Sequence, residues 1–323
     1  MSLGSVLAQI KDRKALVVGD LMLDEYIVGK ATRISPEAPV MVIRQQSTMS
    51  MPGGAANVAK NVMALGGYAT ILGVVGTDQA AQTLKTAFAE QGIDHTALVE
   101  DRERPTTRKT RVLADHAHQV LRIDHEDEGP LSTSSEEDLL RRALELLPEH
   151  EVIVLSDYLK GALTSRVSGQ IIVAARERGI PTVVNPKPRS LGQYAGATLI
   201  SLNRAEAGDA LKRWQGLTDS DAEEAAAEIR ELLGVATVVV TLGESGLVAS
   251  SQEKSYNVRA PRVEVYDTAG AGDTIVATVA LGAAAGADFP AVLNLATQTA
   301  AAVVRKVGVA TPSQEDLDDI AAG

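Results

Sequence analysis

Short apolar runs separated by amphipathic segments dominate the hydrophobic pattern of this chain. The runs are rich in β-branched residues and do not alternate apolar with polar positions, which predicts strands buried on both faces of a sheet. They are Ala15–Val18, Ile71–Val75, Val152–Leu155, Thr182–Val184, Leu199–Ser201 and Thr237–Thr241. Helical periodicity between them predicts helices at Ala55–Leu65, Gln79–Gln91, Ser135–Leu147, Val167–Arg178 and Ala222–Leu233. The alternation predicts an α/β fold with a doubly wound, mostly parallel sheet flanked by helices.

Two segments interrupt this rhythm, at about residues 26–43 and 96–124. The second contains extended pieces at Thr107–Leu113 and Gln119–Ile123. We interpret both segments as strands of a small β lid that covers the functional site. Because a small sheet needs its open face covered, the lid is also expected to join two copies of the chain into a homodimer. The expected organisation is a single domain, residues 1–323, that carries this lid.

Composition and charge narrow the class of protein. The 323 residues are 45% hydrophobic, enough to supply a large core. A net charge of −11 disfavours nucleic acid as a partner and requires a local basic cluster for any anionic substrate. The chain has no cysteine, which excludes disulfides and thiolate metal sites. No apolar run reaches the ~18 residues that span a bilayer, so a cytoplasmic protein with no membrane partner is expected.

The octapeptide from Asp267 to Thr274 combines a backbone anion cradle with a carboxylate. Its small residues let backbone N–H groups approach a charged ligand, and they are Gly270, Ala271 and Gly272. The Ala-rich stretch Thr274–Ala285 predicts a helix whose positive N-terminus faces the cradle. Asp273 could then accept a proton from an attacking hydroxyl during phosphoryl transfer. A helix cap would explain Asp273 equally well.

Candidate sugar-binding residues lie after the first strand and around the start of the first predicted core helix. Gly53 and Gly54 permit close approach of the backbone, and Asn57 offers a donor and an acceptor to a polyol. The alternative is an ordinary glycine turn with Asn57 on the helix surface. Asp20 and Asp24 lie at the carboxyl end of the first strand, where open sheets bind ligands, and Asp24 is better placed for sugar hydroxyls.

Candidate nucleotide-binding residues follow two later strands. Asn203 and Glu206 lie one helical turn apart, which suits Mg²⁺ held directly or through water, although a capping pair has the same spacing. Thr241, Gly243 and Gly246 form a strand end and glycine turn suited to a nucleotide phosphate. Neither a P-loop nor a dinucleotide-binding fingerprint is present.

Gly53–Ala59 and Asp267–Asp273, in this order, resemble the two signatures of the ribokinase-like sugar kinases, the PfkB family. The resemblance spans essentially the whole chain and matches Asn203–Glu206 to the family's magnesium motif. It implies a ribokinase-like fold and an ATP- and Mg²⁺-dependent sugar kinase. The implied roles are Asp273 as base, N–H groups from Ala269 to Gly272 as anion hole, Asp24, Gly53, Gly54 and Asn57 for the sugar, and Gly243, Gly246 and Lys187 for the nucleotide. A monovalent cation such as K⁺ near Asp267 is a further implication.

Other segments resemble the kinases of bacterial ADP-heptose synthesis, which phosphorylate O1 of D-glycero-β-D-manno-heptose 7-phosphate. They are Gly19–Asp24, Arg33–Val40, Gln119–Asp124 and Ser156–Gly161. The chain departs from these kinases at two places. It has Asn185 where they usually have Asp, and it ends at Gly323, after which no nucleotidyltransferase domain is expected.

The far phosphate of such a substrate would need cations on the lid. Lys109 and Arg111 share one face of a predicted strand and Arg108 lies on the other, with Arg33 as a further candidate. Solvated lid charges or subunit contacts are the alternative. A ribokinase- or fructokinase-like kinase of an unphosphorylated sugar, and a non-catalytic sugar or nucleotide sensor, also remain open.

Overall fold

The computed structural model describes residues 1–115, 118–127, 129–213, 216–306 and 308–323. The helices are α1 (Leu3–Ile10), α2 (Ala55–Ala64), α3 (Gln79–Glu90), α4 (Thr133–Leu146), α5 (Ser165–Glu177), α6 (Arg204–Ala210), α7 (Ala222–Leu233), α8 (Ala271–Ala285), α9 (Phe289–Val303) and α10 (Gln314–Ala322). The strands are β1 (Lys14–Gly19), β2 (Leu21–Ile34), β3 (Met41–Gly54), β4 (Tyr68–Leu72), β5 (Val74–Val75), β6 (Val99–Glu100), β7 (Thr107–Ala114), β8 (His118–His125), β9 (Val152–Ser156), β10 (Thr182–Asn185), β11 (Leu199–Asn203), β12 (Thr237–Thr241), β13 (Leu247–Ser251) and β14 (Ser255–Val258).

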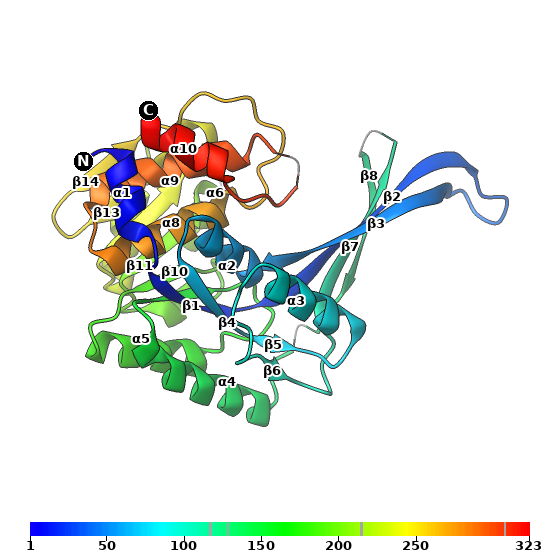
Figure 1. Ribbon diagram of the computed structural model, residues 1–323, viewed down its shortest axis with the longest axis horizontal. Coiled ribbons are helices and arrows are strands. Elements are labelled where there is room, and N and C mark those ends of the chain that lie inside the picture. Colours follow the sequence, from blue (N-terminus) through cyan, green and yellow to red (C-terminus); the bar gives the residue numbers. More distant parts are fainter. Residues whose placement is uncertain (116–117, 128, 214–215, 307) are drawn as a thin grey trace.

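The main sheet has the strand order β14-β13-β12-β11-β10-β9-β1-β4 (Figure 1). The strands from β12 to β4 are parallel, and β13 and β14 add an antiparallel edge. Register aligns Gly19, Ser156 and Asn185 across β1, β9 and β10, and aligns Asn203 with Thr241 across β11 and β12. The carboxyl ends of these strands therefore form one edge, where ligands of open α/β sheets bind.

The strands of the sheet other than the edge strand β14 supply two hydrophobic cores, one on each face. In β1, Ala15 and Val17 pack toward α2, α8 and α9, whereas Leu16 and Val18 pack toward α4, α5 and α7. Helices therefore cover both faces, as Figure 1 shows. Because both sides of the strands are dry, the sequence shows continuous apolar runs instead of alternation, and the predicted α/β fold class is confirmed.

The helix α8 is deeply buried, and its N-terminus lies near the carboxyl edge of the main sheet. Every residue from Asp273 to Gly282 is buried, between α2 and α9. Its polar side chains are satisfied internally, since the hydroxyl of Thr274 donates to Asn61 Oδ1 at 2.7 Å and that of Thr278 donates to the Thr274 carbonyl at 2.8 Å. This packing immobilises the N-terminus of α8 at the sheet edge.

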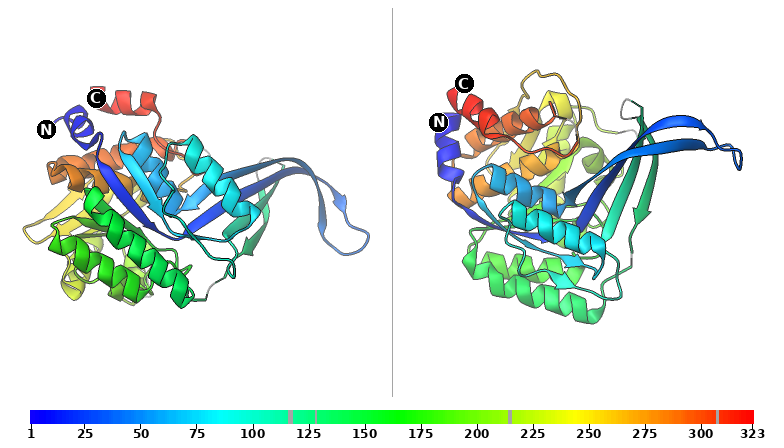
Figure 2. Two further views of the ribbon diagram at one scale, coloured as in Figure 1. Left: turned by 60° about the horizontal axis from the view of Figure 1, so that its bottom comes forward. Right: turned by 45° about the vertical axis from the view of Figure 1, so that its right-hand side comes forward.

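The lid is a separate sheet with the order β3-β2-β7-β8. Figure 2 shows the β2 and β3 pair projecting beyond β7 and β8. The predicted lid boundaries were too short at the N-terminal segment, because β2 starts at Leu21 and β3 continues to Gly54. They were too long at the second segment, because β6 pairs with β5 outside the lid. Residues 116 and 117 within that segment lie outside the described residues.

Two further sequence expectations need correction. The predicted strand Ile71–Val75 is divided at Gly73, where a Cβ atom would approach the Gly19 carbonyl oxygen to 2.5 Å. The chain bends there, so β4 remains in the main sheet while β5 leaves it. The short edge strands β13 and β14 and the helices α1, α9 and α10 were not predicted. Within the described ranges, no helix is both long and apolar enough to cross a bilayer.

Candidate active site

The glycine cradle occupies the first turn of α8. Gly270 is the N-cap with φ 84°, and a Cβ atom there would lie 2.9 Å from Asn57 Nδ2. Among the described residues, no hydrogen bond engages the N–H of Gly270 or Gly272. Ala271 opens the helix beside them. The Ala269 N–H donates to Asp267 Oδ1 at 2.9 Å and the Ala271 N–H donates to the Thr268 carbonyl at 3.4 Å, so the unengaged donors of the anticipated set are those of Gly270 and Gly272. These N–H groups can receive an anion.

Asp273 is buried in the first turn of α8 and does not cap it. The Asn57 amide donates to Asp273 Oδ2 at 2.7 Å, and the Tyr158 hydroxyl donates to Oδ1 at 3.0 Å. Burial raises the pKa of Asp273 to about 6, although both hydrogen bonds and nearby Lys187 oppose that shift. A carboxylate with this pKa can accept a proton near neutral pH.

Tyr158 reaches Asp273 from a loop that follows β9, and the sequence patterns did not identify it as a site residue. Buried Asp20 holds this loop, because its carboxylate accepts the N–H groups of Tyr158 at 2.8 Å, Lys160 at 2.9 Å and Ala162 at 3.0 Å. Asp20 thus has a structural role, and only Asp24 lies in the candidate sugar region. The Asp20 position in the sequence, directly after β1, could have suggested this loop contact.

The expected sugar-binding residues gather at the root of the lid. Asp24 is buried, and a Cβ atom at Gly53 would lie 2.0 Å from its Oδ2, so the glycine leaves room for this carboxylate. Gly54 is the N-cap of α2 with φ 62°. Asn57 Oδ1 is buried and has no hydrogen-bond partner among the described residues. It can accept a hydrogen bond from a hydroxyl group of a polyol.

The two lid cations differ in their surroundings. Arg111 forms an ion pair with Asp24 at 2.5 Å, and its guanidinium lies 5.3 Å from the ring centroid of Tyr26. Lys109 pairs in register with Asp24 but forms no ion pair within the described part of the chain. Partial burial lowers the pKa of the Lys109 ammonium. An anion near Lys109 would offset that desolvation.

The expected magnesium residues form a capping box. Asn203 Oδ1 accepts the Glu206 N–H at 2.9 Å, and Glu206 Oε2 accepts the Asn203 N–H at 2.9 Å. The second oxygen, Glu206 Oε1, accepts Lys187 Nζ at 2.7 Å. Capping is therefore present, and the cluster also brings one carboxylate and one ammonium to the carboxyl edge of the sheet. Over the described ranges, no group of three His, Cys, Asp or Glu side chains could hold a metal by itself.

The remaining nucleotide candidates lie along the same edge. Thr241 is level with Asn203 in the neighbouring strand. Gly243 starts a short 3₁₀ turn and faces open space, whereas Gly246 packs against the Val258 carbonyl oxygen. In the segment that leads into α8, Asp267 Oδ2 accepts the Gly308 N–H at 3.0 Å.

Comparison with known proteins identifies the family of this chain. The pfkB family carbohydrate kinase domain matches residues 12–316. The chain belongs to the pfkB family of carbohydrate kinases.

Similar proteins include the bifunctional protein HldE of Nitrobacter hamburgensis, 42% identical over 94% of this chain, and that of Bradyrhizobium diazoefficiens, 40% identical over 95%. The chain spans 62% and 63% of these two relatives. Phosphofructokinase-2 from Escherichia coli in complex with potassium superposes with a TM-score of 0.79 at 24% identity, covering 97% of this chain and 98% of that one. Arabidopsis thaliana ribokinase complexed with ribose and ATP has a TM-score of 0.74 at 19% identity, covering 97% and 99%. These solved structures establish the ribokinase-like fold.

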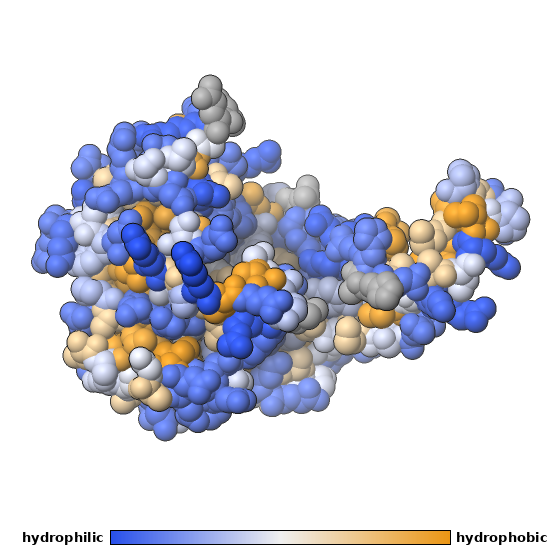
Figure 3. Space-filling model, turned by 90° about the horizontal axis from the view of Figure 1, so that it is seen from above, coloured by the Kyte–Doolittle hydropathy of each residue, from blue (hydrophilic) through white to orange (hydrophobic). Residues whose placement is uncertain are grey.

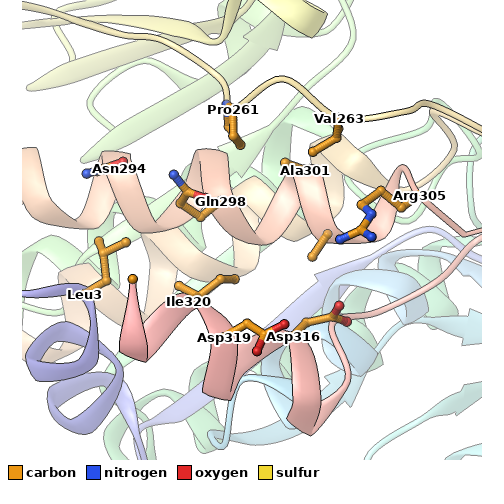
Figure 4. Close-up of a pocket in the computed structure, with 12 residues that line it drawn as sticks. Leu3, Pro261, Val263, Asn294, Gln298, Ala301, Arg305, Asp316, Asp319 and Ile320 are labelled. Carbon is orange, nitrogen blue, oxygen red and sulfur yellow. The ribbon is translucent and has the colours of Figure 1, made fainter.

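A surface pocket of about 380 Å³ lies elsewhere in this pfkB-family chain (Figure 4). It is bounded by α9, α10 and the segment that carries Pro261 and Val263, with Arg305 and Asp319 on its wall. Its lining includes none of the residues that surround Asp273. The pocket is therefore separate from the candidate active site.

Proposed function

We propose that residues 1–323 act as a single ATP-dependent kinase domain that phosphorylates O1 of D-glycero-β-D-manno-heptose 7-phosphate. The observation that carries the reaction type is the buried Asp273 carboxylate beside unengaged N–H groups at the start of α8. The heptose assignment is supported by about 40% identity to bifunctional HldE proteins and by the segments Gly19–Asp24 and Ser156–Gly161, which resemble heptose 7-phosphate kinases.

The chemistry follows from these groups. The acceptor hydroxyl attacks the γ-phosphorus, the bond from that phosphorus to the bridging oxygen of ADP breaks, and Asp273 takes the hydroxyl proton. The N–H groups of Gly270, Ala271 and Gly272 stabilise charge on the transferring phosphoryl group. Asp24, Asn57 and the backbone at Gly53 and Gly54 hold the sugar. Lys187, Asn203, Thr241, Gly243 and Gly246 bind the nucleotide.

Two ions complete the proposed site. Asn203 and Glu206 fit Mg²⁺ held through water, because Mg²⁺ in kinases relies on one or two protein oxygens and on substrate phosphates. Mg²⁺ neutralises phosphate charge when it is bound. The family resemblance implies a monovalent cation near Asp267, and the potassium complex of Escherichia coli phosphofructokinase-2, which shares this fold, supports K⁺ as its identity.

The central experiment measures ADP release with heptose 7-phosphate, fructose 6-phosphate, ribose and fructose. We expect the highest kcat/KM with heptose 7-phosphate and a loss of ~10²–10⁴ in Asp273→Asn, which cannot accept the proton. Because only the ionised carboxylate is a base, kcat/KM should fall as pH decreases through about 6.

Each other outcome identifies an alternative. A preference for ribose or fructose would leave a kinase of an unphosphorylated sugar. Binding of sugar or ATP without ADP release would indicate a sensor. Near wild-type turnover in Asp273→Asn would refute the assignment of the base.

A second prediction concerns recognition of the far phosphate. We propose that Lys109 contacts it directly, whereas Arg111 orients Asp24 through their ion pair. Lys109→Ala should raise KM for heptose 7-phosphate ~10- to 100-fold, the value of a charge-assisted contact, and leave KM for ATP unchanged. Arg108→Ala, on the opposite face of β7, is the matched control. Equal KM values in both variants would show that Lys109 is a solvated lid charge.

A third prediction separates the two ions. Glu206→Gln keeps an oxygen that can accept the Asn203 N–H but loses the carboxylate charge, so the Mg²⁺ concentration for half-maximal rate should rise several-fold. In both wild type and variant, K⁺ should increase kcat relative to choline at equal ionic strength. A Mg²⁺ titration that does not move, with a lower Tm, would mean that Glu206 only caps α6.

A fourth prediction concerns assembly. We infer a homodimer joined through the lid, supported by exposed Leu121 and Ile123, two residues apart on β8, and by exposed Ile34 and Met41 at the β2 and β3 end. Figure 3 shows apolar surface near the end of this projecting arm. Because a tetrameric inhibited form of phosphofructokinase-2 exists, larger assemblies are an alternative.

Sedimentation velocity provides the test of the dimer. The wild type should sediment as a dimer, and Leu121→Ser with Ile123→Ser should shift it toward monomer because apolar surface is no longer buried. Val173→Ser, an exposed apolar position on α5 away from the lid, is the control. A monomeric wild type, or an unchanged double variant, would contradict the lid interface.

A further inference from the structure

Tyr158 lies between the two charged groups that the proposed reaction uses. Its hydroxyl donates to Asp273 Oδ1 at 3.0 Å, and its ring centroid lies 4.9 Å from Lys187 Nζ. Lys187 in turn binds Glu206 at 2.7 Å. One aromatic side chain thus contacts both the carboxylate at the start of α8 and the cation at the nucleotide side.

The loop that carries Tyr158 is held by hydrogen bonds to buried side chains. Two buried carboxylates hold it. Asp20, directly after β1, accepts three backbone N–H groups of the loop, and Asp157, within the loop, accepts the Leu159 N–H at 2.7 Å. Leu159 has φ 58°, which is uncommon for a leucine and is stabilised by that hydrogen bond. The Tyr194 hydroxyl also donates to Asp157, at 2.7 Å. The position of Tyr158 is therefore set by buried polar contacts.

We propose that Tyr158 is a positioning residue for phosphoryl transfer: its hydroxyl fixes the Asp273 carboxylate and its ring face holds the Lys187 ammonium. The inference rests on the proposed function, in which Asp273 is the base and Lys187 binds phosphate.

The geometry explains why two partners on Asp273 help the reaction. Each carboxylate oxygen accepts up to two hydrogen bonds, so Asn57 on Oδ2 and Tyr158 on Oδ1 leave sites for a sugar hydroxyl. Together they prevent rotation of the carboxylate about χ2. Burial and the Asp273 charge raise the pKa of Tyr158 well above its ordinary value, so the phenol remains a donor at all working pH values.

Hydrogen bonding by Tyr158 also favours the ionised form of Asp273. The charged groups that face this carboxylate are Asp24 from β2, Lys60 from α2 and Lys187 from the segment after β10. Removal of the phenol hydroxyl leaves those charges in place. The pKa of Asp273 should therefore rise when only that hydroxyl is deleted.

The test is Tyr158→Phe, which removes one oxygen and keeps the ring. We expect kcat to fall roughly 10- to 100-fold, the value of one hydrogen bond to a charged group, with KM for ATP unchanged. The acid limb of the kcat/KM profile should move to higher pH. Tyr158→Leu, which also removes the ring, should show the same loss of kcat and additionally raise KM for ATP.

Ser135→Ala is the matched control, because it deletes another buried hydroxyl hydrogen bond to a carboxylate, that of Ser135 to Asp101, without touching Asp273 or the Tyr158 loop. It should lower Tm and leave the acid limb unmoved. A thermal double-mutant cycle of Tyr158→Phe with Asp273→Asn should be non-additive, which reports the contact even if activity is too low to measure.

The outcomes distinguish this inference from the function on which it rests. Wild-type kcat and pH profile in Tyr158→Phe, while Asp273→Asn is inactive, would overturn the role of the hydroxyl alone. An equal KM for ATP in the Leu and Phe variants would overturn the role of the ring. Activity in Asp273→Asn itself would overturn the proposed function.

Discussion

The carboxylate of Asp273 is buried at the start of α8, and the polar groups around it are arranged to stabilise its charge. Burial alone would favour the protonated form, and it raises the pKa to about 6. Hydrogen bonds from Asn57 and Tyr158, and the charge of Lys187, limit that rise. A positive helix terminus adds to them. Each of these groups comes from a different part of the chain.

Several other features serve to hold those groups in place. The Asn57 amide can reach Asp273 because Gly270 has no side chain to displace it. The Tyr158 loop is positioned by Asp20, which lies directly after β1 and accepts its N–H groups. Both contacts occur at the carboxyl edge of the sheet, where strands distant in sequence end at the same level.

Within the lid, an ion pair between the neighbouring strands β7 and β2 has a structural role that the sequence did not suggest. Arg111 binds Asp24, and Gly53 leaves the space that the Asp24 carboxylate occupies. The two lid strands that carry Asp24 and Arg111 are therefore linked by a largely buried ion pair, and salt screens such a pair less than an exposed one. Lys109, level with Asp24 in the neighbouring strand, forms no ion pair among the described residues.

Local sequence determined the central strands, α2, α8 and the glycine cradle, because dry strands and buried helices require continuous apolar residues, and a tight anion site requires residues without bulky side chains. It also singled out Asp273, Asn57 and the Asn203–Glu206 pair as candidate site residues. Spacing could not reveal the break at Gly73 or the full length of β2 and β3, because both depend on contacts with distant backbone. Only the tertiary structure decided that Arg111 pairs with Asp24 and that Tyr158 reaches Asp273, because those partners are 87 and 115 residues apart. The first pair meets only where β7 lies beside β2 in the lid, and the second only where the loop after β9 meets the start of α8.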